Sequence, residues 1–169
     1  DVRPARYSPE DIRRIEEDYA REVRQGRVPR HWEDIAIGEE IRPVVKGPLT
    51  TADVIAWLMG AGSPFVRPLG LAVEDRKKMP ASYIVNPETG APEAVERVHW
   101  DDAWAQQVGN PYAYDFGRMR TAWLTHAVAN WMGDDGWLWK MDDQQRLFNY
   151  VGDTTWIRGK VAKKYAQDE

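Results

Sequence analysis

One stretch of the chain has the residue types and spacing for proton-transfer chemistry. It runs from His99 to Gly109, reads HWDDAWAQQVG, and fits the pattern H-x-D-x-x-x-A-x-x-x-G. An imidazole titrates near neutral pH, so His99 can serve as a general acid or base. Two plainer interpretations stand beside this one. His99 can simply pack beside Trp100 at a strand end, and Asp101 can cap a short helix.

Other common kinds of site find no support in the sequence. The chain has no Cys, and its three His residues, at 31, 99 and 126, form neither HxxxH nor HExxH, so a zinc site is not expected. None of its Ser residues lies in a GxSxG motif. Gly60-Ala61-Gly62 is not followed by a third Gly or a Walker Lys, so nucleotide-binding loops find no support. No cofactor is therefore expected.

The helices and strands that must position His99 can be predicted from helix-capping residues, from the periodicity of apolar residues, and from the residues that end a helix. Ser8-Pro9 begins a helix that Gly26 can end, and Thr50 with Asp53 begins another that ends at Gly60. The remaining helices are expected at 99–109, capped by Asp101, and at 117–131, the longest apolar-periodic segment. Strands are expected within 31–40 before a turn at Gly38, and at 41–49, 83–85, 148–151 and 154–163. This order predicts an α+β fold, with a helical extension over 1–30 and one domain over 31–169.

The His99 motif and several other stretches resemble one known family. The motif is similar to the hydratase motif of the MaoC-like acyl-CoA hydratases and dehydratases, which adopt the hotdog fold. Stretches that look like the N-terminal-type MaoC dehydratase domain follow in the same order along the chain: WEDIAIGE, KGPLTTAD, YDFGRMR, NWMGDDGWL and FNYVGDTTWIRGKV. The resemblance covers residues 31–165 and implies a long helix wrapped by a curved antiparallel sheet.

The resemblance implies an activity and a set of site residues. A His and an Asp of the family share one water, which is added to or removed from the α,β double bond of an acyl thioester. His99 falls on the catalytic His, but the acid position, five residues earlier, falls on Ala94. Asp115, just before the long helix, could replace that acid or only cap the helix. The predicted catalytic residues are therefore His99 and Asp115.

Residues for binding the thioester follow from the same resemblance. The backbone N–H of Gly117 at the helix start could face the thioester oxygen. Arg118 could meet the phosphates of coenzyme A, although a surface arginine is the commoner case. Trp100 and Tyr114 complete the predicted substrate-binding set. Coenzyme A enters only as part of the substrate, and no metal is predicted.

Three functions remain open at this stage. The first is an enoyl-CoA hydratase or 3-hydroxyacyl-CoA dehydratase. The second is a non-catalytic hotdog subunit that completes the acyl-CoA site of a catalytic partner, an alternative that Ala94 favours. The third is a hotdog thioesterase, in which a carboxylate such as Asp115 would activate water or attack the thioester.

The composition limits which binding partners and which cellular location are expected. The 169 residues carry 23 basic and 27 acidic side chains, with no basic stripe that would indicate a nucleic-acid partner. The longest apolar or Gly run, 54–62, is far below the ~20 residues of a membrane span, and no signal peptide is visible. A cytoplasmic protein is expected. Nine Trp residues and an edge strand ending near Lys163, which a further segment or chain could complete, predict a homodimer or a heteromer with a related subunit.

Overall fold

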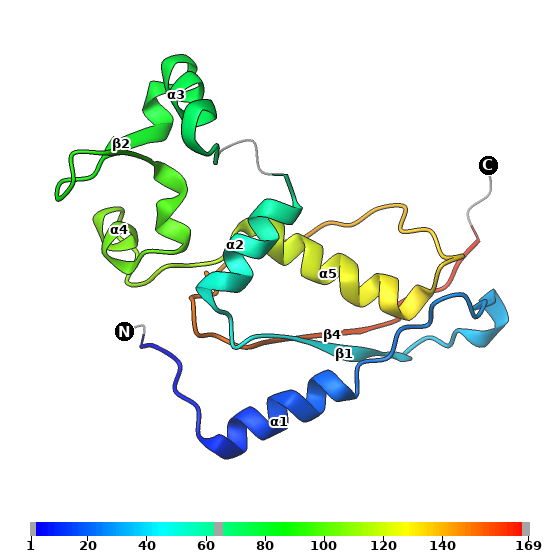
Figure 1. The fold of residues 1–169 in the computed structure, drawn as a ribbon. Coiled ribbons are helices and arrows are strands. Elements are labelled where there is room, and N and C mark those ends of the chain that lie inside the picture. Colours follow the sequence, from blue (N-terminus) through cyan, green and yellow to red (C-terminus); the bar gives the residue numbers. More distant parts are fainter. Residues whose placement is uncertain (1–2, 63–65, 167–169) are drawn as a thin grey trace. The chain divides into compact units, whose positions relative to one another are not determined.

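The computed structural model describes residues 3–62 and 66–166 of the chain (Figure 1). Its elements are helices and short antiparallel strands, which confirms the α+β class. Two compact units are present. The first holds Leu49–Phe116 and Phe148–Val151, and the second holds Ala5–Pro48, Gly117–Leu147 and the residues from Gly152 onward.

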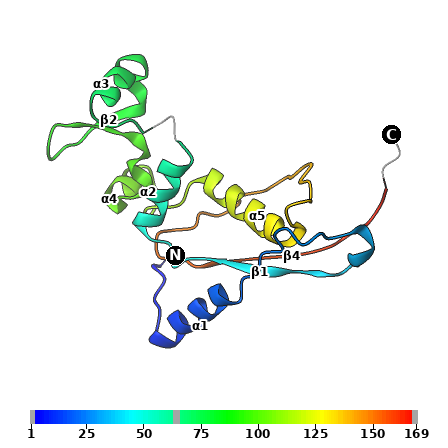
Figure 2. The same ribbon diagram turned by 45° about the vertical axis from the view of Figure 1, so that its right-hand side comes forward.

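The second unit is built around a two-stranded antiparallel sheet of β1 (Glu40–Lys46) and β4 (Thr155–Lys160). Helices α1 (Pro9–Ala20) and α5 (Gly117–Met132) lie on opposite sides of this sheet in both views (Figures 1 and 2). Successive strand side chains point to opposite faces. Val44 and Val45 are both almost fully buried, as a strand covered on each face requires.

Helix α5 confirms the expected long helix, and its buried side chains recur one turn apart. Met119, Trp123 and Ala127 are each less than a tenth exposed. A spacing of four residues puts all three on one face of a helix. These three side chains are therefore part of the core of the second unit.

Helix α1 begins as the sequence predicts and ends earlier. Ser8 and Asp11 form a reciprocal capping box, in which the Ser8 Oγ accepts from the Asp11 N–H. The helix stops at Ala20, well before the expected stop at Gly26. Glu22 leaves the helical path, because its carboxylate accepts the Val45 N–H at 2.8 Å on the edge of β1.

The strand expected within 31–40 is wrong. Trp32–Asp34 forms a 3-10 turn (η1), because the Asp34 carboxylate accepts the His31 N–H at 2.9 Å and closes the backbone locally. The turn at Gly38 is confirmed, with φ at 87°, and β1 begins only at Glu40.

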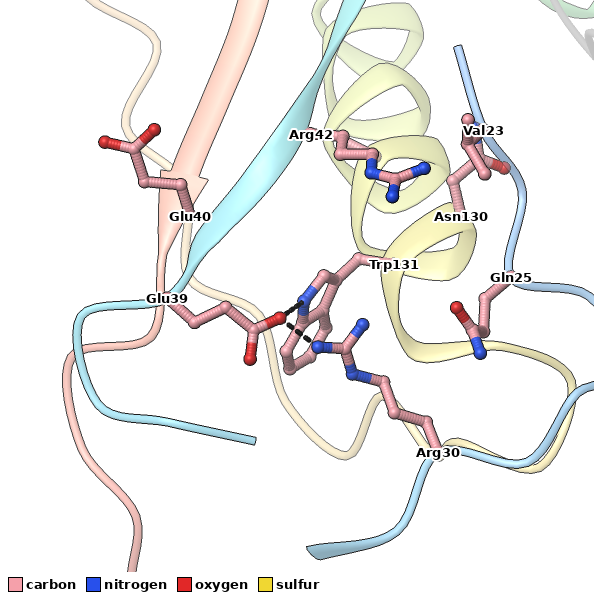
Figure 3. A pocket seen from close by; sticks show the side chains of 9 residues that line it. Val23, Gln25, Arg30, Glu39, Glu40, Arg42, Asn130 and Trp131 are labelled. Carbon is pink, nitrogen blue, oxygen red and sulfur yellow. Dashed lines mark hydrogen bonds and ion pairs between the residues drawn. The ribbon is translucent and has the colours of Figure 1, made fainter. Parts of the chain in front are cut away.

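The far end of α5 is fixed to the segment before β1 by a polar clamp. Figure 3 shows the Glu39 carboxylate joined to both Trp131 and Arg30. Its carboxylate accepts from Trp131 Nε1 at 3.0 Å and pairs with Arg30, whose guanidinium lies 4.7 Å from the centre of the Trp131 ring. The hydrogen bond from Trp131 is the largest cause that lowers the pKa of Glu39. These groups line a cavity of about 220 Å³, and their mutual contacts give this corner a structural role.

The first unit contains the short elements that surround His99. These are α2 (Thr51–Gly60), α3 (Leu69–Lys78), η2 (Pro80–Ser82), β2 (Tyr83–Val85), β3 (Pro92–Ala94), η3 (Val95–His99) and α4 (Asp102–Gln107). The predicted caps of α2 by Thr50 and of α4 by Asp101 are confirmed. The strand at 83–85 is also confirmed, and it pairs with β3 across a turn that begins at Asn86. Helix α3, β3 and η3 were not predicted.

The strand expected at 148–151 is wrong in extent. Only one isolated antiparallel bridge forms there, between Tyr114 and Tyr150. The Asp115 N–H donates to the Asn149 carbonyl at 2.9 Å, and the Val151 N–H donates to the Ala113 carbonyl at 2.9 Å. These bonds hold the segment against 113–115 without making a regular ladder.

Candidate functional site

His99 is the last residue of η3, and its ring is held from one side by the backbone. Its Nδ1 lies 2.8 Å from the carbonyl oxygen of Tyr114. A carbonyl can only accept, so the hydrogen of this bond belongs to Nδ1. The Tyr114 carbonyl therefore fixes both the ring orientation and the tautomer, and Nε2 is left for chemistry.

Aromatic rings enclose the same imidazole. The Phe116 ring lies with its centre 3.7 Å from the His99 ring, and the Tyr114 ring meets it edge-on at 4.7 Å. Trp57 of α2 contacts Phe116 in turn, with ring centres 5.5 Å apart. The His99 side chain is 12% exposed. Its ring is thus positioned on a rigid apolar wall and still reaches solvent.

A carboxylate that the sequence analysis did not select faces the free nitrogen. Glu96 Oε2 lies 3.2 Å from His99 Nε2. Both residues belong to η3, and a 3-10 helix has three residues per turn, so side chains at i and i+3 eclipse each other. The local 3-10 geometry is therefore what brings this acid to the imidazole.

The contact between Glu96 and His99 has the geometry of an ion pair. Because the Tyr114 carbonyl holds the hydrogen of the neutral ring on Nδ1, Nε2 faces the carboxylate, and the two groups attract when the imidazole is protonated. An imidazole placed beside a carboxylate in this way can act as a general acid or base.

The position at which the family motif has its acid is occupied in this chain by an apolar residue. Ala94 is the last residue of β3 and pairs with Tyr83 of β2. It lies one residue before η3 begins, whereas Glu96 lies within η3. The sequence signal for Glu96 was present, because an acid three residues before a His is a common ion-pair spacing on a helix. It was missed because the sequence predicted no helix between Ala94 and His99.

An ion-pair cluster holds η3 in place. Arg97 donates to Asp101 at 2.6 Å, pairs with Glu93, and lies 4.7 Å from the centre of the Trp104 ring. The Asp101 hydrogen bond is the largest cause that raises the pKa of Arg97. Asp101 also caps α4 through the Trp104 N–H, so the cluster ties η3 to the next helix.

Tyr114 contributes its ring and hydroxyl to the same corner of the unit. Burial is the main cause that raises the pKa of the Tyr114 hydroxyl, and the negative charge of Glu96 adds to it. The hydroxyl therefore keeps its proton at neutral pH and can act as a hydrogen-bond donor. The substrate-binding role predicted for Tyr114 stays a prediction, and the same holds for Trp100, which follows η3 and is half-buried.

Asp115 lies in the first unit as well, but its carboxylate meets Asn149. The residue is 1% exposed, and its oxygens lie 3.1 Å from Asn149 Nδ2 and 3.4 Å from the Asn149 N–H. These bonds fix the residue just before the bridge at Tyr150. The predicted catalytic role of Asp115 stays a prediction, and Glu96 is the carboxylate that contacts His99.

We expect Asp115→Asn to act mainly on stability. Hydrogen bonds to a charged group contribute about 1.5–3 kcal/mol, and the substitution removes the buried charge that strengthens those to Asn149. Chemical denaturation should show a loss of about 1–2 kcal/mol, whereas Asp135→Asn at an exposed position should change the free energy of unfolding by less than about 0.5 kcal/mol. A large fall in turnover at unchanged stability would instead make Asp115 the catalytic acid.

The two remaining predicted residues belong to the second unit. Gly117 begins α5, and its carbonyl accepts from Gln145 Nε2 at 2.7 Å. Arg118 is exposed on the first turn of the same helix. Their predicted roles toward the thioester oxygen and the phosphates of coenzyme A stay predictions.

The part of the chain that the structure describes contains neither a membrane-spanning helix nor a cluster of metal ligands. No helix there combines the length and apolar character needed to cross a bilayer. No group of three or more His, Cys, Asp or Glu side chains within those residues is arranged to hold a metal ion. Compared with known proteins, the chain matches no family model, no curated protein and no solved structure.

Proposed function

We propose that this chain is a MaoC-like hydro-lyase that interconverts an enoyl-CoA and a 3-hydroxyacyl-CoA. The observation that carries the proposal is the contact of 3.2 Å between His99 Nε2 and Glu96 Oε2. It supplies the acid that Ala94 lacks, next to the His that heads the hydratase motif. The neighbouring hydroxyl of Tyr114 offers a neutral donor in the same unit.

The acid and base steps of the proposed reaction use this pair and one water. In hydration, the water oxygen bonds to the β-carbon of the enoyl thioester, and one proton of the water passes to the pair. The pair gives a proton to the α-carbon, so the pair returns to its starting protonation state. Dehydration is the same sequence reversed. A positioned acid/base of this kind contributes typically about 10²–10⁴-fold in rate.

The proposal includes the hotdog fold and a paired assembly. A long helix with a buried face against an antiparallel sheet, as α5 has against β1 and β4, is the part of that fold which supports it. The substrate would be an acyl-CoA thioester, and the assembly a homodimer or a heteromer with a related subunit. We place this assembly in the cytoplasm.

A non-catalytic subunit is the second candidate, and one observation favours it. The side chain of His99 is 12% exposed, and both of its ring nitrogens already have partners within the chain. An imidazole held in this way can stabilise the first unit without ever meeting a substrate. In that case the chain would complete the acyl-CoA site of a catalytic partner.

An activity assay on the full chain tests the proposal. Crotonyl-CoA and a longer enoyl-CoA should lose their enoyl-thioester absorbance when the chain is added, with a 3-hydroxyacyl-CoA as product. Thioester binding without turnover, together with turnover once a related hotdog subunit is added, would favour the non-catalytic subunit. Release of free coenzyme A would identify a thioesterase and overturn the hydro-lyase.

A further inference from the structure

A groove in the second unit lies between α1 and β4, apart from the residues used above. Its volume is about 480 Å³, and its walls are formed by both elements and by the residues just before α1. Its lining combines two aromatic side chains, Tyr7 and Trp156, with three arginines and two aspartates. Some of these charged side chains are paired with other residues of the chain, and others are not.

The two acidic residues of the groove are already neutralised within the chain. Asp11 accepts from Ser8 Oγ at 2.7 Å and from the Ser8 N–H at 3.0 Å, and it also pairs with Arg14. These bonds, the Ser8 side chain first, lower the pKa of Asp11 to about 2. Asp18 pairs with Arg21 at 3.1 Å and accepts from Trp156 Nε1 at 2.8 Å. Neither acid is left to repel an anion strongly.

Two arginines of the same groove have no such partner. Arg6 and Arg158 are exposed, and within the described residues neither has an acidic side chain within 4.0 Å. The strand that carries Arg158 adds to this charge. Residues 155–166 contain four basic side chains and no acidic one, in a chain whose net charge is −4. A second hollow, of about 410 Å³, shares Arg158 with the groove and is lined by Lys160 and by the acidic Glu40. The groove is thus a local cationic site on an acidic protein.

The aromatic walls of the groove are held in fixed positions. The bond from Trp156 Nε1 to Asp18 orients the indole, which remains 40% exposed. The Tyr7 hydroxyl donates to the Gly152 carbonyl at 2.7 Å and lies 2.8 Å from Thr154 Oγ1. Because the indole is already held in place, packing a flat ligand ring against it costs little conformational entropy.

We propose that this groove binds a small phosphate monoester that carries a flat unsaturated ring. The phosphate lies between the guanidinium groups of Arg6 and Arg158, whose planar donor forks suit phosphate oxygens. The ring lies against the exposed part of Trp156. This inference does not rest on the proposed function, because the groove and His99 belong to different compact units.

Calorimetric titration of the full chain with phenyl phosphate at low ionic strength tests the proposal. Inorganic phosphate and phenol are titrated in parallel, so that the contributions of charge and ring are separated. We expect phenyl phosphate to bind at millimolar concentration or below, severalfold tighter than inorganic phosphate, with phenol not bound. Binding should weaken with added salt, because the charges involved are exposed.

Variants of the two arginines decide where the probe binds. Arg6→Gln and Arg158→Gln should each weaken phenyl phosphate binding about fivefold or more, the range expected for a charge-assisted pair. Arg13→Gln is the matched control, since Arg13 is exposed on α1 and pairs with Glu10 outside the groove. Wild-type affinity in both groove variants, or equal weakening in Arg13→Gln, would overturn the site. Equal affinity for phenyl phosphate and inorganic phosphate would overturn the role of Trp156.

Discussion

His99→Gln is expected to lower the turnover of an enoyl-CoA by about 10²–10⁴-fold, the usual cost of losing a general acid or base. Glutamine keeps a side chain of similar reach, and its amide can still donate to the Tyr114 carbonyl that now holds Nδ1 at 2.8 Å. Folding and thioester binding should therefore be nearly intact. The measurement is the initial rate of hydration, with thermal unfolding followed on the same preparations.

Glu96→Gln should cause a loss of the same order, because Glu96 is the carboxylate that faces His99 Nε2 at 3.2 Å. Residues that act as a unit give non-additive losses, so the double variant should be little slower than either single variant. His126→Gln is the control. His126 lies on α5 in the second unit, where it is exposed. An unchanged rate in His99→Gln, from a preparation shown to be active, would contradict the catalytic role and leave the subunit alternative.

Helices were predicted from the sequence where a side chain fixes their first turn. Ser8, Thr50 and Asp101 each accept a backbone N–H at the start of a helix, and each was expected to do so. Helix α3 has no such cap, and its Leu69 and Leu71 are 89% and 62% exposed. Without a cap or a buried face, neither of the two sequence signals for a helix was present there.

The candidate site could be predicted only in part, and the reason lies in local backbone geometry. The motif singled out His99, but the acid was sought at the family spacing or across the loop at Asp115. A five-residue 3-10 helix cannot be read from apolar periodicity, yet it alone places Glu96 over His99. The same limit applies to 31–40, where the bond from His31 to Asp34 replaces the expected strand.

The largest effect on stability is expected from Trp123→Ala. Trp123 is 8% exposed at the middle of α5, with Met119 and Ala127 buried one turn to either side. Removing the indole should leave a cavity that the neighbouring turns cannot close, which costs about 3–5 kcal/mol. Urea unfolding followed by circular dichroism measures this loss, and Trp123→Phe should recover a large part of it because the phenyl ring refills the space.

Trp137→Ala is the matched control, because the same residue type there is 81% exposed. Its loss should stay within about 0.5 kcal/mol, as for other surface substitutions. If both variants lost the same small amount, α5 would not be the helix around which the second unit is organised. The hotdog proposal would then lose its structural support, since the buried face of α5 against β1 and β4 is the feature on which it depends.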